Sequence, residues 1–148
     1  MSDAIMLDAG PLGLLANPRL TVPTKLALNW LGDLLKAGRR VIVPAIADYE
    51  VRRELIRINA GSSLASLDAM IARLGFLPLS IDALRLAADY WAQARQSGFP
   101  TAPNPALDCD VILAAQATTC GTPVIVATAN LRHLHRFVTA ELWHNIVP

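Results

Sequence analysis

The sequence predicts a three-layer α/β sandwich in which helices cover both faces of a central, mainly parallel sheet. Short apolar runs at 4–7, 41–43 and 124–126 are uninterrupted by polar residues, which is typical of strands buried on both faces. Longer segments with the apolar spacing of helices lie between them, and this alternation favours strand–helix–strand units. The chain of 148 residues has no internal repeat, so we expect a single domain over residues 1–148.

The expected elements follow in chain order, and turn-forming residues mark several of their ends. Strands are expected at 4–7, 41–43, 76–79 and 124–126, with an edge strand at 143–147. Helices are expected at 24–37, 45–58, from 62 or 63 to 74, and at 82–96, 108–120 and 131–135. Thr24 can cap the first helix and Gly38 can close it, while Pro44 suits the first turn of the second. The segment 98–105 holds three of the ten prolines and is the expected irregular loop.

Composition limits the class of protein. Apolar residues make up 53% of the chain and the mean hydropathy is +0.39, while charged residues make up 17%. Disorder requires the opposite balance, and we expect part of so apolar a surface to be covered by a second copy or by another protein. The formal net charge is +1, so binding to nucleic acid would need a local basic patch.

Cysteine spacing and the start of the chain favour a cytoplasmic protein. Cys109 and Cys120 form no CxxC pair and are expected as reduced, buried thiols. The N-terminal segment lacks the basic and apolar regions of a signal peptide. Residues 111–131 carry no formal charge, but Gly121-Thr122-Pro123 interrupts them. A buried helix, a turn and a buried strand therefore explain this stretch better than a membrane span.

Acidic side chains stand where strands of the predicted sheet end or where helices begin. Ligands of an open parallel sheet bind at the carboxyl ends of its strands. The residues expected at this edge are Asp8, Glu50, Asp108, Asp110, Thr128 and Asn130. Carboxylates gathered in this way repel one another and raise one another's pKa values, which a hard cation such as Mg²⁺ resolves. Two such ions can activate a water and stabilise the leaving oxygen in phosphodiester cleavage.

Each acidic residue also has a purely structural interpretation. Glu50 could pair with neighbouring arginines on a solvated helix face. Asp108 is a good helix N-cap, and Asp110 would be favoured by the helix dipole. Residues two apart point to opposite sides of a regular helix, so both aspartates reach one site only if Asp108 lies at or before the cap.

Four segments of the chain resemble the successive motifs of the PIN-domain family, whose best-known bacterial members are the VapC toxins of toxin–antitoxin pairs. The segments are Ile5–Asp8, Tyr49–Leu55, Asp110–Ala117 and Ala127–Asn130. The resemblance extends from residue 4 to about residue 146. The third motif, an aspartate leading into Ile-Leu-Ala-Ala, is the most specific of the four.

The resemblance implies an endoribonuclease that depends on Mg²⁺ or Mn²⁺ and cleaves single-stranded RNA. It also implies a homodimer and inhibition by a small antitoxin protein whose tail enters the acidic groove. By position, Asp8, Glu50 and Asp110 match the three main acidic ligands, and Asp108 matches an additional acidic position. Thr128 and Asn130 match the hydroxyl and the fourth acidic position.

The sequence departs from the family pattern at two places. Ala9 and Gly10 supply no side-chain hydroxyl or amide after the first aspartate, and the fourth acidic position is the neutral Asn130. One firmly held ion and a weaker second one are therefore expected. The second hypothesis is a catalytically degenerate PIN scaffold that acts as a protein- or RNA-binding module.

Basic side chains follow two of the motifs. Arg52, Arg53 and Arg132 could line the approach to the acidic site and hold RNA phosphates. A charged, solvated helix surface is the equally weighted alternative.

Overall fold

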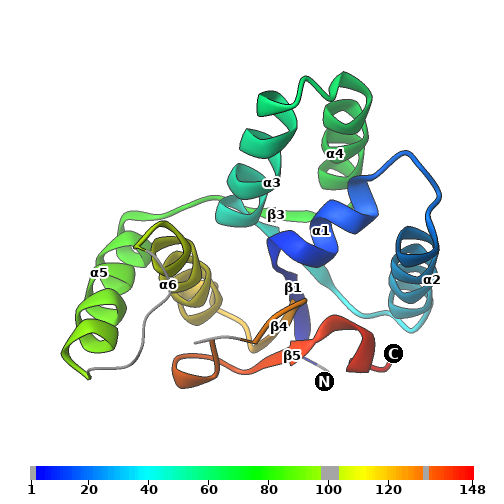
Figure 1. Ribbon diagram of the computed structural model, residues 1–148. Helices are drawn as coiled ribbons and strands as arrows, with labels where there is room; N and C mark the ends of the chain where they lie inside the picture. The colour runs from blue at the N-terminus through cyan, green and yellow to red at the C-terminus, as the bar shows by residue number, and fades with distance from the viewer. Residues whose placement is uncertain (1–2, 98–103, 132–133) are drawn as a thin grey trace.

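The computed structural model describes residues 3–97, 104–131 and 134–148, and within them a five-stranded parallel sheet is flanked by helices (Figure 1). The strand order is β3-β2-β1-β4-β5. The strands are β1 (Ala4–Leu7), β2 (Val41–Pro44), β3 (Gly75–Leu77), β4 (Val124–Thr128) and β5 (Ala140–Leu142). The helices are α1 (Ala9–Ala16), α2 (Val22–Lys36), α3 (Ala45–Arg57), α4 (Gly61–Arg73), α5 (Ile81–Gln96) and α6 (Asn104–Thr119). Two 3-10 turns, η1 (Leu134–Arg136) and η2 (Trp143–Asn145), complete the described chain.

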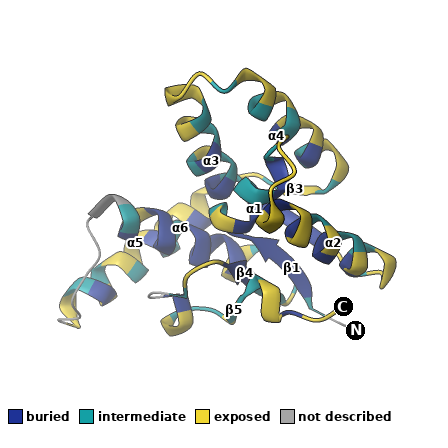
Figure 2. Ribbon diagram, turned by 45° about the vertical axis from the view of Figure 1, so that its right-hand side comes forward, coloured by how far each residue is buried: buried dark blue, intermediate teal, exposed yellow. Residues whose placement is uncertain are grey.

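The helices form layers on the two faces of the sheet because successive strand residues point to opposite sides. Ile5 and Leu7 of β1 lie in a core with residues of α1, α2, α3 and α4. Ala4 and Met6 point the other way, into a core with α6, and α5 packs on α6 through a third cluster. Figure 2 shows the central strands in dark blue, as expected of strands buried on both faces. The predicted three-layer α/β sandwich is confirmed, and its sheet is parallel throughout.

Strand β1 lies at the centre of the sheet, and all four of its residues are buried. It pairs in parallel with β2 on one side and with β4 on the other. The carboxyl ends of three neighbouring strands therefore meet where β1 runs into α1. This arrangement places Asp8, the start of α3 and the end of β4 along one edge of the sheet.

The sequence prediction missed α1 altogether. This helix starts directly after β1, with Asp8 as its N-cap and Pro11 in its first turn. Two glycines within eight residues weaken the helical pattern, since glycine has a low helix propensity. Burial of Leu12 and Leu15 against the sheet layer supplies the stability that propensity lacks.

Two other boundaries differ from the prediction. Helix α6 begins at Asn104 rather than at Asp108, because a proline such as Pro105 is readily accommodated in the first turn of a helix. The rest of the predicted loop, 98–103, lies outside the described residues. The helix predicted at 131–135 is reduced to the short turn η1, with residues 132 and 133 outside the described part.

The edge strand predicted at 143–147 is wrong. The fifth strand is β5, and the chain then turns through η2. The cause is a tertiary contact: the Trp30 ring of α2 packs edge-on against Trp143, with centroids 5.4 Å apart. Trp30 Nε1 also donates a hydrogen bond of 3.0 Å to the carbonyl oxygen of Ile146. The tail is thus held by α2 instead of by strand pairing.

None of the helices in the described ranges is long and apolar enough to cross a lipid bilayer.

Candidate active site

Asp8 is fixed through both of its carboxylate oxygens. As the N-cap of α1, its Oδ1 accepts a hydrogen bond of 2.7 Å from the backbone N–H of Ala9. Its Oδ2 accepts a second bond of 2.7 Å from the hydroxyl of Thr128, at the end of β4. The residue is only 8% exposed. Each oxygen keeps a further lone pair, so the carboxylate is oriented while remaining able to bind a cation.

The hydroxyl of Thr128 connects Asp8 to the loop after β4. It lies 2.7 Å from Asp8 Oδ2 and 3.0 Å from the carbonyl oxygen of Asn130. A hydroxyl has one proton, and the shorter contact to an anionic acceptor is the stronger bond, so Thr128 donates to Asp8. The hydroxyl in turn accepts the backbone N–H of Asn130 at 3.1 Å. Asn130 itself is exposed.

Gly10 lets the two loops at this edge approach each other. A Cβ atom built on Gly10 would lie 2.8 Å from the Cβ of Ala129, closer than two carbon atoms can pack. Glycine at position 10 departs from the family pattern. The contact between the start of α1 and the end of β4 nevertheless requires it, because a larger residue would not fit.

The second acidic group lies where α3 meets α6. Cys109 is buried between charged neighbours: burial and, next, the negative charge of Glu50 raise the pKa of its thiol to about 11. Arg53 opposes this shift in the Cys109 pKa, and Asp110 adds to it. Glu50, Arg53 and Asp110 therefore surround one thiol, and Asp110 is only 6% exposed. Glu50 of α3 and Asp110 of α6 thus both lie near Cys109.

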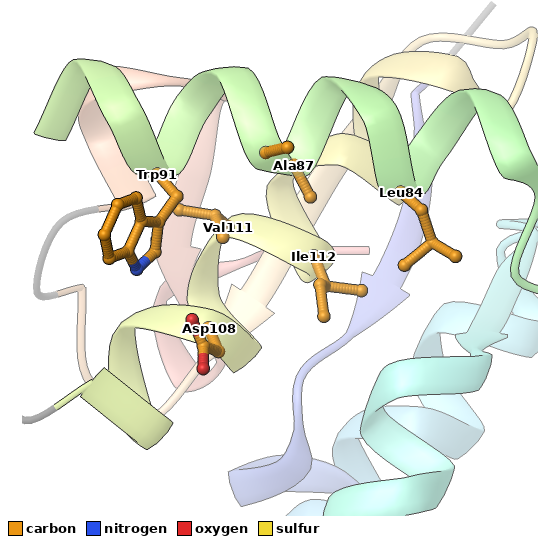
Figure 3. A pocket seen from close by; sticks show the side chains of 7 residues that line it. Leu84, Ala87, Trp91, Asp108, Val111 and Ile112 are labelled. Carbon is orange, nitrogen blue, oxygen red and sulfur yellow. The ribbon is translucent and has the colours of Figure 1, made fainter.

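Asp108 is separated from this group. Because α6 begins at Asn104, both aspartates lie within the helix and point to different sides of it. Asp108 is exposed. It lines a groove of about 410 Å³ between α5 and α6, together with apolar residues that include Trp91 and Val111 (Figure 3). Asp108 and Asp110 could share one site only if Asp108 lay at or before the helix cap. Asp108 instead lies inside α6.

Gln116 is a residue of the site region that the sequence analysis missed. Its side chain is 1% exposed. Oε1 accepts the backbone N–H of Ile46 at 3.1 Å, and Nε2 donates to the carbonyl oxygens of Leu77 and Pro78 at 3.2 and 3.3 Å. The N-cap of α3, Pro44, provides no side-chain bond, so an amide from α6 satisfies one of the orphan donors of α3. A single side chain thus fixes the helix that carries Glu50 to the helix that carries Asp110.

The arginines predicted to bind RNA have different surroundings. The guanidinium of Arg52 bonds to Asp48 at 3.0 Å and to Asp68 at 2.6 Å, which ties α3 to α4. The guanidinium of Arg53 lies over the ring of Tyr49, 5.0 Å from its centroid. Arg132 lies outside the described residues. Of the two that the structure describes, Arg53 is the one near Glu50.

The donors at this edge suit a hard cation. Asp8 and Asp110 are the only buried carboxylates among the described residues, and burial of a charged carboxylate is costly unless it is compensated. Within those same residues, no three His, Cys, Asp or Glu side chains converge into a ready metal cage. Mg²⁺ is commonly held by one or two carboxylates together with waters and substrate phosphate. The residues present fit that mode of binding.

Solved structures share this fold over nearly the whole chain. The VapBC2 complex of Rickettsia felis bound to promoter DNA has a TM-score of 0.71 and 17% identity, covering 95% of this chain and 98% of that one. DNA-bound VapBC from Salmonella typhimurium has a TM-score of 0.67 and 22% identity, with coverage of 96% and 99%. FitAcB from Neisseria gonorrhoeae has a TM-score of 0.70 and 20% identity, with the same coverage, 96% and 99%. No family model and no curated protein matches the sequence. The predicted PIN-like fold is confirmed.

We expect Gln116→Leu to lower the free energy of unfolding by about 2–3 kcal/mol, because it leaves a buried N–H and two carbonyls without their partner. Urea denaturation measures the change. Gln93→Leu, at an exposed position of α5, is the matched control and should stay within about 0.5 kcal/mol. Equal unfolding midpoints for the two variants would contradict this role of Gln116.

Gly10→Ala should destabilise the chain by about 1–3 kcal/mol, because the new methyl group overlaps Ala129. Replacement of glycine by alanine within a helix normally stabilises by about 0.5–1 kcal/mol. That opposite sign is expected for Gly32→Ala in α2, where a Cβ would meet nothing within 4 Å. Adding Ala129→Gly to Gly10→Ala should restore stability in thermal unfolding. A double variant no more stable than Gly10→Ala would rule out the steric explanation.

Proposed function

We propose that this chain is a divalent-metal-dependent endoribonuclease that cleaves single-stranded RNA, and that it is the toxin of a toxin–antitoxin pair. The observation that carries the proposal is the placement of the two buried carboxylates, Asp8 and Asp110, with Glu50 at one edge of a parallel sheet. The structural neighbours are toxin–antitoxin complexes, and that similarity of fold supports the biological role.

The site residues have different roles in the proposed hydrolysis of the phosphodiester bond. Asp8, Glu50 and Asp110 would hold Mg²⁺, or Mn²⁺ in its place, and the bound ion supplies charge stabilisation and an activated water. Thr128 and the amide of Ala9 keep the Asp8 carboxylate in one orientation, so its position does not have to be reorganised during the reaction. Cleavage leaves a 5′-phosphate and a 3′-hydroxyl.

A small antitoxin and a second copy of the chain are the proposed protein partners. The first follows from the neighbours, which were solved as complexes. The second is supported by large apolar side chains exposed on α5, where Ile81 and Leu84 are 62% and 42% exposed. Exposed apolar patches of this kind mark protein contacts more often than chance placement does.

A catalytically degenerate scaffold is the second candidate. It is favoured by Asn130, which is neutral and exposed where the family pattern has an acidic residue. Calorimetric titration with Mn²⁺ separates the two functions: a nuclease binds the ion, whereas a scaffold binds none even at millimolar concentration.

Asp8→Asn and Asp110→Asn should each lower the rate of RNA cleavage by about 100-fold or more, because each removes a charged oxygen that binds the cation. The assay compares cleavage of mixed single-stranded RNA in Mg²⁺, with and without a chelator. Thermal unfolding of each variant checks that the fold is kept. Equal cleavage by both variants and the parent chain, or cleavage that persists in the chelator, would refute the proposed mechanism.

Asp108→Asn should cleave RNA at a rate within about threefold of the parent chain, because substitutions at exposed positions away from the site have small effects. This outcome follows from the position of Asp108 in the α5/α6 groove, on a different side of α6 from Asp110. A loss as large as that of Asp110→Asn would show that Asp108 is a ligand, as the family pattern implies.

A further inference from the structure

The helix that carries Glu50 also carries an exposed aromatic side chain. Tyr49 precedes Glu50 in α3, and 55% of its surface is open to solvent. Arg53, one helical turn further on, places its guanidinium 5.0 Å from the centre of the ring. Hydrogen bonding to Tyr49 raises the pKa of Arg53, so the two side chains form one unit with a permanent positive charge.

This Tyr49–Arg53 pair lies at the junction of α3 and α6. Arg53 follows Glu50 by three residues and Tyr49 by four, so it is a neighbour of both on the surface of α3, and α3 packs against α6. The residue after Cys109 is Asp110, and the residue after Tyr49 is Glu50. The pair therefore lies close to Glu50, near the contact of α3 with α6.

Fold stability does not account for this exposed pair. An exposed cation–π contact contributes little to stability, and a ring so open to solvent gains little from burial. The neighbouring Arg52 differs, because it pairs with Asp48 within α3 and with Asp68 of α4. Within the described residues, Arg53 forms no ion pair of that kind.

We propose that the Tyr49–Arg53 pair is a binding platform for one nucleotide of a single-stranded RNA, with the base stacked on Tyr49 and its phosphate held by Arg53. The inference rests on the proposed RNA substrate and adds the residues that position it. A phenol ring stacks on any base, and a guanidinium forms paired hydrogen bonds to a phosphate. The platform therefore aligns the strand beside the carboxylates without reading its sequence.

A second pair with the same spacing provides a matched control. On α5, the guanidinium of Arg95 lies 5.2 Å from the ring centre of Trp91, and Trp91 is 36% exposed. Trp91 borders the groove that contains Asp108 (Figure 3), on a different side of α6 from Asp110. If any exposed aromatic–arginine pair on this protein bound RNA, both pairs would contribute.

The test measures binding of a fluorescein-labelled single-stranded RNA by anisotropy, with every variant built on Asp110→Asn so that the RNA stays intact. Loss of one stacked base costs about 1–3 kcal/mol, so Tyr49→Ala should raise Kd about fivefold or more. Tyr49→Phe keeps the ring and should bind like the parent. Arg53→Ala should lower the slope of log Kd against log salt by about 1, which is the change expected for the loss of one phosphate contact. Trp91→Ala should leave Kd within about twofold.

Equal affinity of Tyr49→Ala and the parent would overturn the inference, and so would an equal loss in Trp91→Ala. Absence of any RNA binding by the parent would overturn it together with the RNA substrate. The nuclease assay is independent: a chain that binds RNA through Tyr49 but does not cleave it would keep the platform and reject the enzyme. In the active chain, Tyr49→Ala should raise KM more than it lowers kcat, which a merely structural defect would not do.

Discussion

Two hydrogen bonds to the Asp8 carboxylate join the centre of the sheet to its functional edge. One comes from the start of α1 and the other from Thr128 at the end of β4. The second bond exists only because β1 and β4 pair in the register that sets Leu7 beside Ala127. A shift of one residue would turn Thr128 to the opposite face of the sheet. The geometry of the first acidic group is therefore a direct product of strand pairing.

Much of the fold could be predicted from local patterns. Strands β1, β2 and β4 are short runs of large apolar residues, and that pattern appears in the sequence because both faces of the sheet are buried. Helix α1 was not predicted because Gly10 and Gly13 interrupt the apolar spacing typical of a helix. Its stability comes from tertiary contacts with the sheet, which a local pattern does not show. The path of the C-terminal tail was predicted wrongly because it depends on Trp30, more than 100 residues away along the chain.

The site was predicted less completely than the fold. Motif order sufficed to select Asp8, Glu50, Asp110 and Thr128. The structure joins Asp8 to Thr128 by a hydrogen bond and places Glu50 and Asp110 near the same thiol, that of Cys109. The separation of Asp108 depends on where α6 begins, which the sequence leaves open by about one helical turn. Gln116 left one signal that could have been used, a single polar residue in an otherwise apolar helical stretch.

The contacts of α3 with α4 and with α6 differ in charge, so they respond differently to ionic strength. The helix is joined to α6 by the neutral, buried amide of Gln116, and to α4 by the ion pair between Arg52 and the exposed Asp68. Ionic strength screens exposed ion pairs but has little effect on a buried amide. Added salt therefore weakens the Arg52–Asp68 pair, while the buried Gln116 bond between α3 and α6 is little affected. Of the two contacts of α3, the one with α4 thus depends on salt and the one with α6 does not.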